Sequence, residues 1–239
     1  MSKTNSVDNL TEEFLDLITH EVQTPLVPIL GFSQALQYPE IFGKLTKQQL
    51  EAIEIIFRNS NNLQTMITNV LDFINLETGK MKFYYKEFNV NDLIMELCEE
   101  CDFKIREEKI QIISKIEKNL ILDSDRFRIK KVLRNLIYNA ISFVPNKNGK
   151  IEIGASEQGK YVLFYVKDNG KGMDKPQQKE IFKIFYQVVQ GKRRKHGGLG
   201  LGLAVCSLIV KNLGGKIWVE SNLGIGSVFY FNISRGNCK

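Results

Sequence analysis

The chain contains few histidines and no long apolar run. Only two histidines occur among its 239 residues, and no stretch approaches the roughly 18 consecutive apolar residues of a membrane-spanning helix. Residues 1–6 contain no apolar signal core. A hydrophobic content of 43% suits a protein that buries a real core. We therefore expect a folded cytoplasmic protein without a membrane span of its own.

Cysteine is also scarce, which argues against a secreted disulfide framework in a chain of this length. Cys98 and Cys101 have the spacing of a zinc-ligand pair, but a structural zinc site needs about four ligands. The nearby sequence offers no second cysteine pair and no histidine. Instead, the two cysteines continue an apolar helical stripe that includes Ile94, Leu97 and Ile105. We expect buried thiols.

The formal net charge of +6 raises the question of nucleic-acid binding. Basic residues are spread along the chain except for one run within residues 191–196, and they do not alternate with aromatic residues on any predicted strand pair. We therefore expect no nucleic-acid partner.

The first third of the chain predicts two helices, because apolar residues recur at three- and four-residue steps. The first helix should end near Tyr38, and the second should begin near Thr46, where Gln49 completes a capping box, and run to Gly79. A lone hairpin of two helices cannot bury both apolar stripes. We therefore assign residues 1–80 to a hairpin that forms a four-helix bundle in a homodimer. The stripe residues are Phe14, Ile18, Val22, Pro25, Ile29, Phe32 and Leu36 in the first helix, and Leu50, Ile53, Phe57, Leu63, Ile67, Val70 and Ile74 in the second.

Residues 81–239 mix helical and strand patterns without regular β-α-β alternation. This order predicts an α+β domain built as a two-layer α/β sandwich. Helices are expected near 91–108, 125–143 and 199–212. Strands are expected within 81–88 and at 110–116, 120–122, 151–156, 161–167, 216–221 and 227–233, with a hairpin across Gly159.

His20 stands in a context that suits a phosphate-accepting imidazole. It lies two residues from both Ile18 and Val22, so a helical period turns it away from the apolar stripe. Glu21 is its neighbour and Thr24 lies one helical turn on. A phosphoryl acceptor also needs a donor, which other segments must bind.

Two glycine-rich segments could bind a nucleotide. Asp168-x-Gly170-x-Gly172 follows an apolar strand, where glycines permit close approach and the carboxylate can accept from an exocyclic amine. The second segment opens a helix, where backbone N–H groups form an anion site; it contains Gly198, Gly200, Leu201, Gly202 and Leu203. Each pattern alone is also compatible with an ordinary turn.

Two further groups are open to more than one interpretation. Asn135 and Asn139 share one helix face and could bind Mg²⁺, or they could simply face solvent. Phe182 and Phe185, predicted on a short helix, could anchor a loop that closes over a ligand. The basic run that follows them could meet a triphosphate or form a solvated surface.

In this order, these segments resemble the sensor histidine kinases of two-component systems, from about Leu10 to Ile233. The His20 segment resembles the H box of the dimerisation domain, and Asn135-x-x-x-Asn139 resembles the N box. Asp168-x-Gly170-x-Gly172, Phe182-x-x-Phe185 and the segment from Gly198 to Leu203 resemble the glycine and F boxes of the GHKL (Bergerat) ATPase domain. Gly224-x-Gly226-Ser227 resembles its closing turn.

The resemblance implies an ATP-dependent autokinase. ATP would bind through Asn135, Asn139, Asp168, Phe182, Phe185 and both glycine segments, with Mg²⁺ at Asn139. His20 would take the γ-phosphoryl group with Glu21 as base and pass it to a response-regulator receiver domain. Thr24 matches the family position for a phosphatase activity. Because only the catalytic core is recognised, signal input is expected from a separate, unknown sensor.

Three positions depart from the family pattern. Gln23 replaces a usual arginine, Ser142 replaces a common phosphate-binding lysine, and Ile184 replaces a frequent polar residue. A weakly catalytic, ATP-binding scaffold or phosphatase is therefore the alternative function. A chaperone- or gyrase-like ATPase is disfavoured by the H box.

Overall fold

The computed structural model describes residues 24–107, 110–117, 119–145, 147–187 and 200–235. They form two compact units, a helical unit that ends at Asn75 and an α/β unit that begins at Leu76. None of the helices in these described segments combines the length and apolar character that crossing a bilayer requires.

The helical unit is a hairpin, as predicted. Residues 24–35 are helical, and α3 (Lys47–Glu77) follows the short helix α2 (Pro39–Phe42) and a turn at Gly43, where φ is +80°. The predicted capping box is confirmed, since Thr46 N donates to Gln49 Oε1 at 2.9 Å and Gln49 N to Thr46 Oγ at 3.3 Å. The first helix ends earlier than predicted and α2 was not expected. Pro39 explains both features, because it holds Tyr38 extended and begins a new helix.

The α/β unit is built on a five-stranded mixed sheet. Its strand order is β2-β4-β5-β7-β6, in which only β2 and β4 are parallel. The strands are β2 (Gln111–Ile116), β4 (Lys150–Gln158), β5 (Tyr161–Asp168), β6 (Lys216–Asn222) and β7 (Gly226–Ser234). A separate antiparallel pair joins β1 (Lys86–Asn89) to β3 (Ile121–Ser124). The predicted hairpin across Gly159 is the β4–β5 pair.

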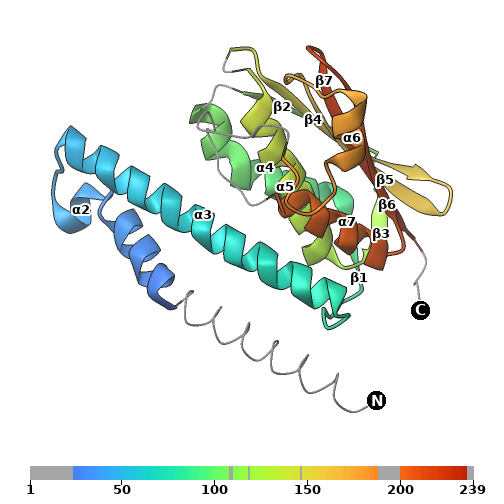
Figure 1. Cartoon of the computed structure of the whole chain (residues 1–239), viewed down its shortest axis with the longest axis horizontal. Coiled ribbons are helices and arrows are strands. Elements are labelled where there is room, and N and C mark those ends of the chain that lie inside the picture. Colours follow the sequence, from blue (N-terminus) through green and yellow to red (C-terminus); the bar gives the residue numbers. More distant parts are fainter. Residues whose placement is uncertain (1–23, 108–109, 118, 146, 188–199, 236–239) are drawn as a thin grey trace. The chain divides into compact units, whose positions relative to one another are not determined.

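Helices α4 (Val90–Glu107), α5 (Arg126–Phe143) and α7 (Gly202–Asn212) cover one face of this sheet (Figure 1). Alternate residues of the central strands face these helices and are fully buried, and the Phe164 and Phe231 rings stack with their centroids 4.8 Å apart. Asp125 caps α5 by accepting from Arg128 N at 2.9 Å. The predicted helical region followed by a two-layer α/β sandwich is therefore confirmed.

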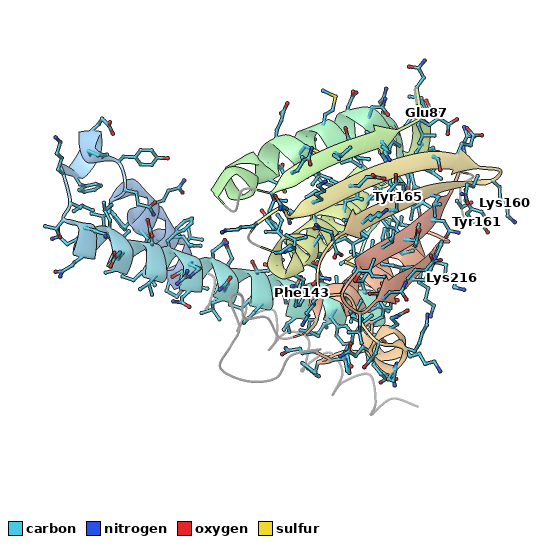
Figure 2. All side chains as sticks on the ribbon, turned by 90° about the horizontal axis from the view of Figure 1, so that it is seen from above. Glu87, Phe143, Lys160, Tyr161, Tyr165 and Lys216 are labelled. Carbon is cyan, nitrogen blue, oxygen red and sulfur yellow. The ribbon has the colours of Figure 1, made fainter. Side chains whose placement is uncertain are left out.

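The other face of the sheet carries a row of aromatic side chains, of which Tyr165 is labelled in Figure 2. Trp218 stacks on Tyr230 at 5.3 Å, and Tyr230 lies 6.2 Å from Tyr165. The Tyr165 ring crosses over Gly154, its partner on β4, and its hydroxyl donates to Glu152 at 2.8 Å. Gly154 therefore allows the tyrosine to lie along the sheet.

Some local predictions are corrected by the structure. Phe182 and Phe185 lie in a turn, and the short helix in this region is instead α6 (Lys175–Glu180), capped by Asp174 and Gln177. Cys101 is buried as expected, but Cys98 is only half-buried; Cys206, for which no prediction was made, is also buried.

Candidate functional site

A pocket opens between the carboxyl end of α5, the loop that follows β5, and the start of β7. It encloses about 330 Å³ including its open mouth. Its lining combines one carboxylate, one amide, one ammonium, one hydroxyl and several apolar side chains. The lining residues are Asn139, Phe143, Asp168, Lys171, Gly172, Met173, Ile181, Ser227 and Phe229.

Asp168 is the buried acid of this pocket, with only 7% of its surface exposed. Burial raises the pKa of its carboxyl group, while backbone N–H groups of Gly170 and Ser227 act in the opposite direction. The Gly170 N–H donates to Asp168 Oδ1 at 2.8 Å. Antiparallel pairing of β5 with β7 sets Asp168 opposite Ser227. The carboxylate is thus fixed in place with lone pairs available to a ligand.

The loop after Asp168 is held against the turn between β6 and β7. Gly172 has φ +66°, and a Cβ there would lie 1.9 Å from the carbonyl oxygen of Asn222. The Gly224 N–H donates to the Lys171 carbonyl oxygen at 2.8 Å. A side chain at position 172 would therefore force the loop away from the turn.

Phe143 and Lys171 lie on the wall that Asn139 also lines. Asn139 stands one helical turn before Phe143 on α5, and the Lys171 Nζ lies 4.6 Å from the centroid of the Phe143 ring. Burial lowers the pKa of the Lys171 ammonium. This wall offers an aromatic face beside a cation and an amide oxygen.

Three residues predicted from the sequence, Asn139, Asp168 and Gly172, are brought together in the pocket. Asn135 and Phe182 lie beside it. Asn135 is half-buried near Gly202. Phe182 meets the pocket residue Phe229 edge-on, with ring centroids 6.4 Å apart.

The remaining predicted residues are spread more widely. Gly170 packs under the end of α5, because a Cβ there would lie 2.7 Å from the Phe143 carbonyl oxygen. Phe185 is exposed, and Gly200 packs against Tyr186 near the start of α7 with φ +73°. Leu201 is buried, Leu203 is half-buried, and Thr24 is exposed in the helical unit. His20, Glu21, Gly198 and the basic run within 191–196 lie outside the described residues.

Sequence reasoning did not assign the pocket residues Phe143, Lys171, Met173, Ile181, Ser227 and Phe229. A signal existed for three of them. Phe143 follows Asn139 by four residues on one helix face, Lys171 lies inside the first glycine segment, and Ser227 ends the closing turn.

Comparison with protein families agrees with this arrangement. Residues 10–79 match the His Kinase A (phospho-acceptor) domain, and residues 124–237 match the histidine kinase-, DNA gyrase B-, and HSP90-like ATPase family. The chain belongs to the histidine kinase family. The two matched regions correspond to the segments that carried the resemblance in the sequence.

Several histidine kinases are similar along most of this chain. The circadian input-output histidine kinase CikA of Synechococcus elongatus is 33% identical over 91% of the chain, which spans 29% of CikA. The signal transduction histidine-protein kinase BarA of Escherichia coli is 32% identical over 94% of the chain, which spans 25% of BarA. The chain therefore corresponds to less than a third of these kinases.

Solved histidine kinase structures share the fold. Full-length ShkA in complex with AMPPNP superposes with a TM-score of 0.73 at 25% identity, covering 95% of this chain and 47% of ShkA. ThkA in complex with the response regulator protein TrrA gives a TM-score of 0.63 at 28% identity, covering 98% of this chain and 64% of the ThkA chain.

Proposed function

We propose that this histidine kinase binds ATP, phosphorylates His20 and passes the phosphoryl group to an aspartate of a response-regulator receiver domain. The observation that carries the proposal is the pocket, in which Asn139 of α5 meets Asp168 and Gly172 of a later segment of the chain. The match of residues 10–79 to a phospho-acceptor domain supports His20 as the acceptor.

The pocket chemistry suits an adenine nucleotide. The Asp168 carboxylate can accept a hydrogen bond from an exocyclic amine, and the Phe143 side chain, which lines the pocket and is 40% exposed, offers apolar surface to a flat base. Lys171 supplies a positive charge at the same wall. Asn135, Phe182, Phe185 and the glycines beside the pocket complete the predicted binding region.

Asn139 fits the predicted Mg²⁺ site. Mg²⁺ needs few protein ligands because it keeps waters and substrate phosphates, and an amide oxygen is an acceptable ligand. Asn139 is half-buried and lines the pocket. A bound Mg²⁺ would neutralise charge on the phosphates.

In the proposed reaction, an imidazole nitrogen of His20 forms a bond to the γ-phosphorus and the bond to the β-phosphate oxygen breaks, so that ADP leaves. Glu21 takes the proton released from the ring. The product is phosphohistidine, from which the receiver aspartate then takes the phosphoryl group.

We also propose the assembly in which this happens. Residues 1–80 would dimerise as a four-helix bundle, and residues 81–239 would form the ATP-binding domain. The complex of the similar kinase ThkA with a response regulator supports a receiver domain as partner. Because the reaction consumes ATP, we expect a cytoplasmic location.

Incubation of the purified protein with γ-labelled Mg·ATP tests this function. We expect a label that is stable to base and labile to acid. His20→Gln should remove the label while ATP binding persists, and Asn139→Ala should nearly remove it. Asn212→Ala is the matched control, since this exposed asparagine at the end of α7 bonds only within its own helix. ATP binding without any label at His20 would contradict the kinase proposal.

The alternative, an ATP-binding scaffold or phosphatase, is favoured by one observation. Ser142, at the position of the family's phosphate-binding lysine, is neutral, and its hydroxyl donates to the Tyr138 carbonyl oxygen at 2.8 Å. Loss of label from a phosphorylated receiver domain measures phosphatase activity. We expect Thr24→Ala to slow this loss, and equal rates for both proteins would reject a role for Thr24.

A further inference from the structure

Two buried hydroxyl groups lie side by side behind the Asp168 wall of the pocket. Ser227, at the start of β7, lines the pocket, whereas Ser221, at the end of β6, does not. Their exposed fractions are 7% and 6%, and their Oγ atoms are 2.9 Å apart. Ser221 therefore acts on the pocket through the lining residues that it contacts, of which Ser227 is one.

The hydroxyl of Ser221 has two backbone partners besides Ser227. Its Oγ accepts from the Met173 N–H at 2.8 Å and donates to the Gly226 carbonyl oxygen at 2.9 Å. The Gln178 side chain fixes the same region, because its Nε2 donates to the carbonyl oxygens of Met173 and Ser221 at 3.0 and 2.8 Å. These hydrogen bonds therefore fix the positions of the groups around the Ser221 hydroxyl.

These contacts favour one direction for the hydrogen bond between the two serines. A hydroxyl carries one proton, and a carbonyl oxygen can only accept. Directing the Ser221 proton to Ser227 would leave the Gly226 carbonyl oxygen without this bond, which favours the arrangement in which Ser221 donates to Gly226 and Ser227 donates to Ser221. In this arrangement Ser227, which lines the pocket with Asp168, has no hydroxyl proton left to donate to a ligand.

We propose that Ser221 is a positioning residue that sets nucleobase selectivity by holding Ser227 as a hydrogen-bond acceptor. Two adjacent acceptors favour the amino group of a 6-aminopurine and disfavour the carbonyl oxygen of a 6-oxopurine. For Ser227 to donate to a 6-oxo group, Ser221 would have to turn its proton away from the buried Gly226 carbonyl oxygen. The inference rests on the proposed nucleotide-binding function.

The test compares the affinities of the whole chain for ADP and for inosine diphosphate. We expect the wild type to prefer ADP. Ser221→Ala should release the Ser227 proton and lower the ratio of the two affinities about tenfold, equivalent to about 1.4 kcal/mol. Ser221→Thr keeps the hydroxyl and should keep the ratio. Ser114→Ala, on the exposed edge strand β2, is a matched serine control that should change neither affinity.

A second variant tests the route through Ser227. Ser227→Ala removes the acceptor itself and should also lower the ratio, and adding Ser221→Ala to it should have no further effect. This cycle remains informative if Ser221→Ala alone fails to fold, because an unchanged ratio in Ser227→Ala would overturn the inference.

The outcomes separate this inference from the proposed function. If the wild type binds ADP and Ser221→Ala weakens ADP and inosine diphosphate equally, Ser221 has a structural role only and the inference is wrong. The proposed function would then still stand. If the wild type binds neither nucleotide, the proposed function fails and the inference fails with it.

Discussion

The helical unit and the α/β unit bury their apolar residues to different extents. Leu26 is the only buried apolar side chain among the described residues of the helical unit, whereas stripe residues such as Ile29 and Phe32 are exposed. In the α/β unit, the helices and the sheet bury a continuous set of apolar side chains. The α/β unit therefore supplies its own core, while the helical unit presents an apolar face that a second copy could cover.

The strongest test of this difference is Phe32→Asp. Phe32 is 64% exposed, and in a symmetric dimer each substitution acts twice. Losing the burial of two phenylalanines at about 1.5–3 kcal/mol each should weaken dimerisation by at least about a hundredfold. Sedimentation at micromolar concentration should show a wild-type dimer and a monomeric variant that still binds ADP.

Phe127→Asp is the matched control, because Phe127 is similarly exposed, at 67%, but belongs to α5 of the α/β unit. It should leave the dimer intact. A wild type that is monomeric at this concentration would contradict the predicted four-helix bundle. Dimerisation would then no longer explain the exposed apolar stripe.

The next largest effect is expected from Asp168→Asn in the α/β unit. Loss of a charged acceptor should weaken ADP binding about ten- to hundredfold. The apo protein should nevertheless become more stable at neutral pH, since burial raises the pKa of this carboxyl above its ordinary value of 3.8. Because the folded-state pKa is raised, the folded state binds more protons than the unfolded state at pH values just above 3.8. The contribution of Asp168 to the free energy of unfolding therefore falls as the pH rises through this window.

Thermal unfolding of the apo proteins at pH 7 and in acid checks this sign. The Asp168→Asn variant should melt at a higher temperature than the wild type at pH 7, and the difference should shrink in acid, where Asp168 is also neutral. A lower melting temperature at pH 7 would show that hydrogen bonds to the carboxylate outweigh the cost of burying it.

Features that depend on neighbouring residues were the easiest to predict from the sequence. The strands of the sheet, the capped start of α3 and the start of α5 were predicted to within a few residues, because alternation and capping are local properties. The short helices α2 and α6 were missed, since four to six residues carry too little periodicity and each depends on a proline at its start.

Parts of the pocket depend on contacts between distant segments. Asp168 could be chosen from its own glycine segment, but Ser227 reaches the pocket only because β5 pairs with β7 and sets these residues opposite each other. The connection of Ser221 to the pocket was even harder to predict than that of Ser227. Its connection to the pocket runs through Ser227 and the Gly226 carbonyl oxygen, and no sequence spacing reveals such a route.

A smaller effect, confined to the α/β unit, is expected from Gly154→Ala. A Cβ at this position would lie 2.0 Å from the Tyr165 ring, which would have to move and give up its hydrogen bond to Glu152. Loss of that bond corresponds to about 1 kcal/mol in the free energy of unfolding. Urea unfolding should detect the change, while sedimentation shows an unaltered dimer. A changed dimer affinity would indicate that the two units are not independent in stability.

The smallest effect is expected from Glu96→Gln. The Glu96 carboxylate on α4 pairs with Lys130 and Arg126 on α5, and hydrogen bonds from these two side chains lower its pKa. A lowered pKa means that any stabilisation is present above the ordinary carboxyl value and is lost in acid. Because the Glu96 and Arg126 side chains are 40% and 39% exposed, the melting temperature should fall by less than about 2 °C, and added salt should reduce the difference. If Glu96→Gln lowered the stability of the protein more than Gly154→Ala does, the ion pairs between α4 and α5, rather than the buried core, would account for the independent stability of the α/β unit.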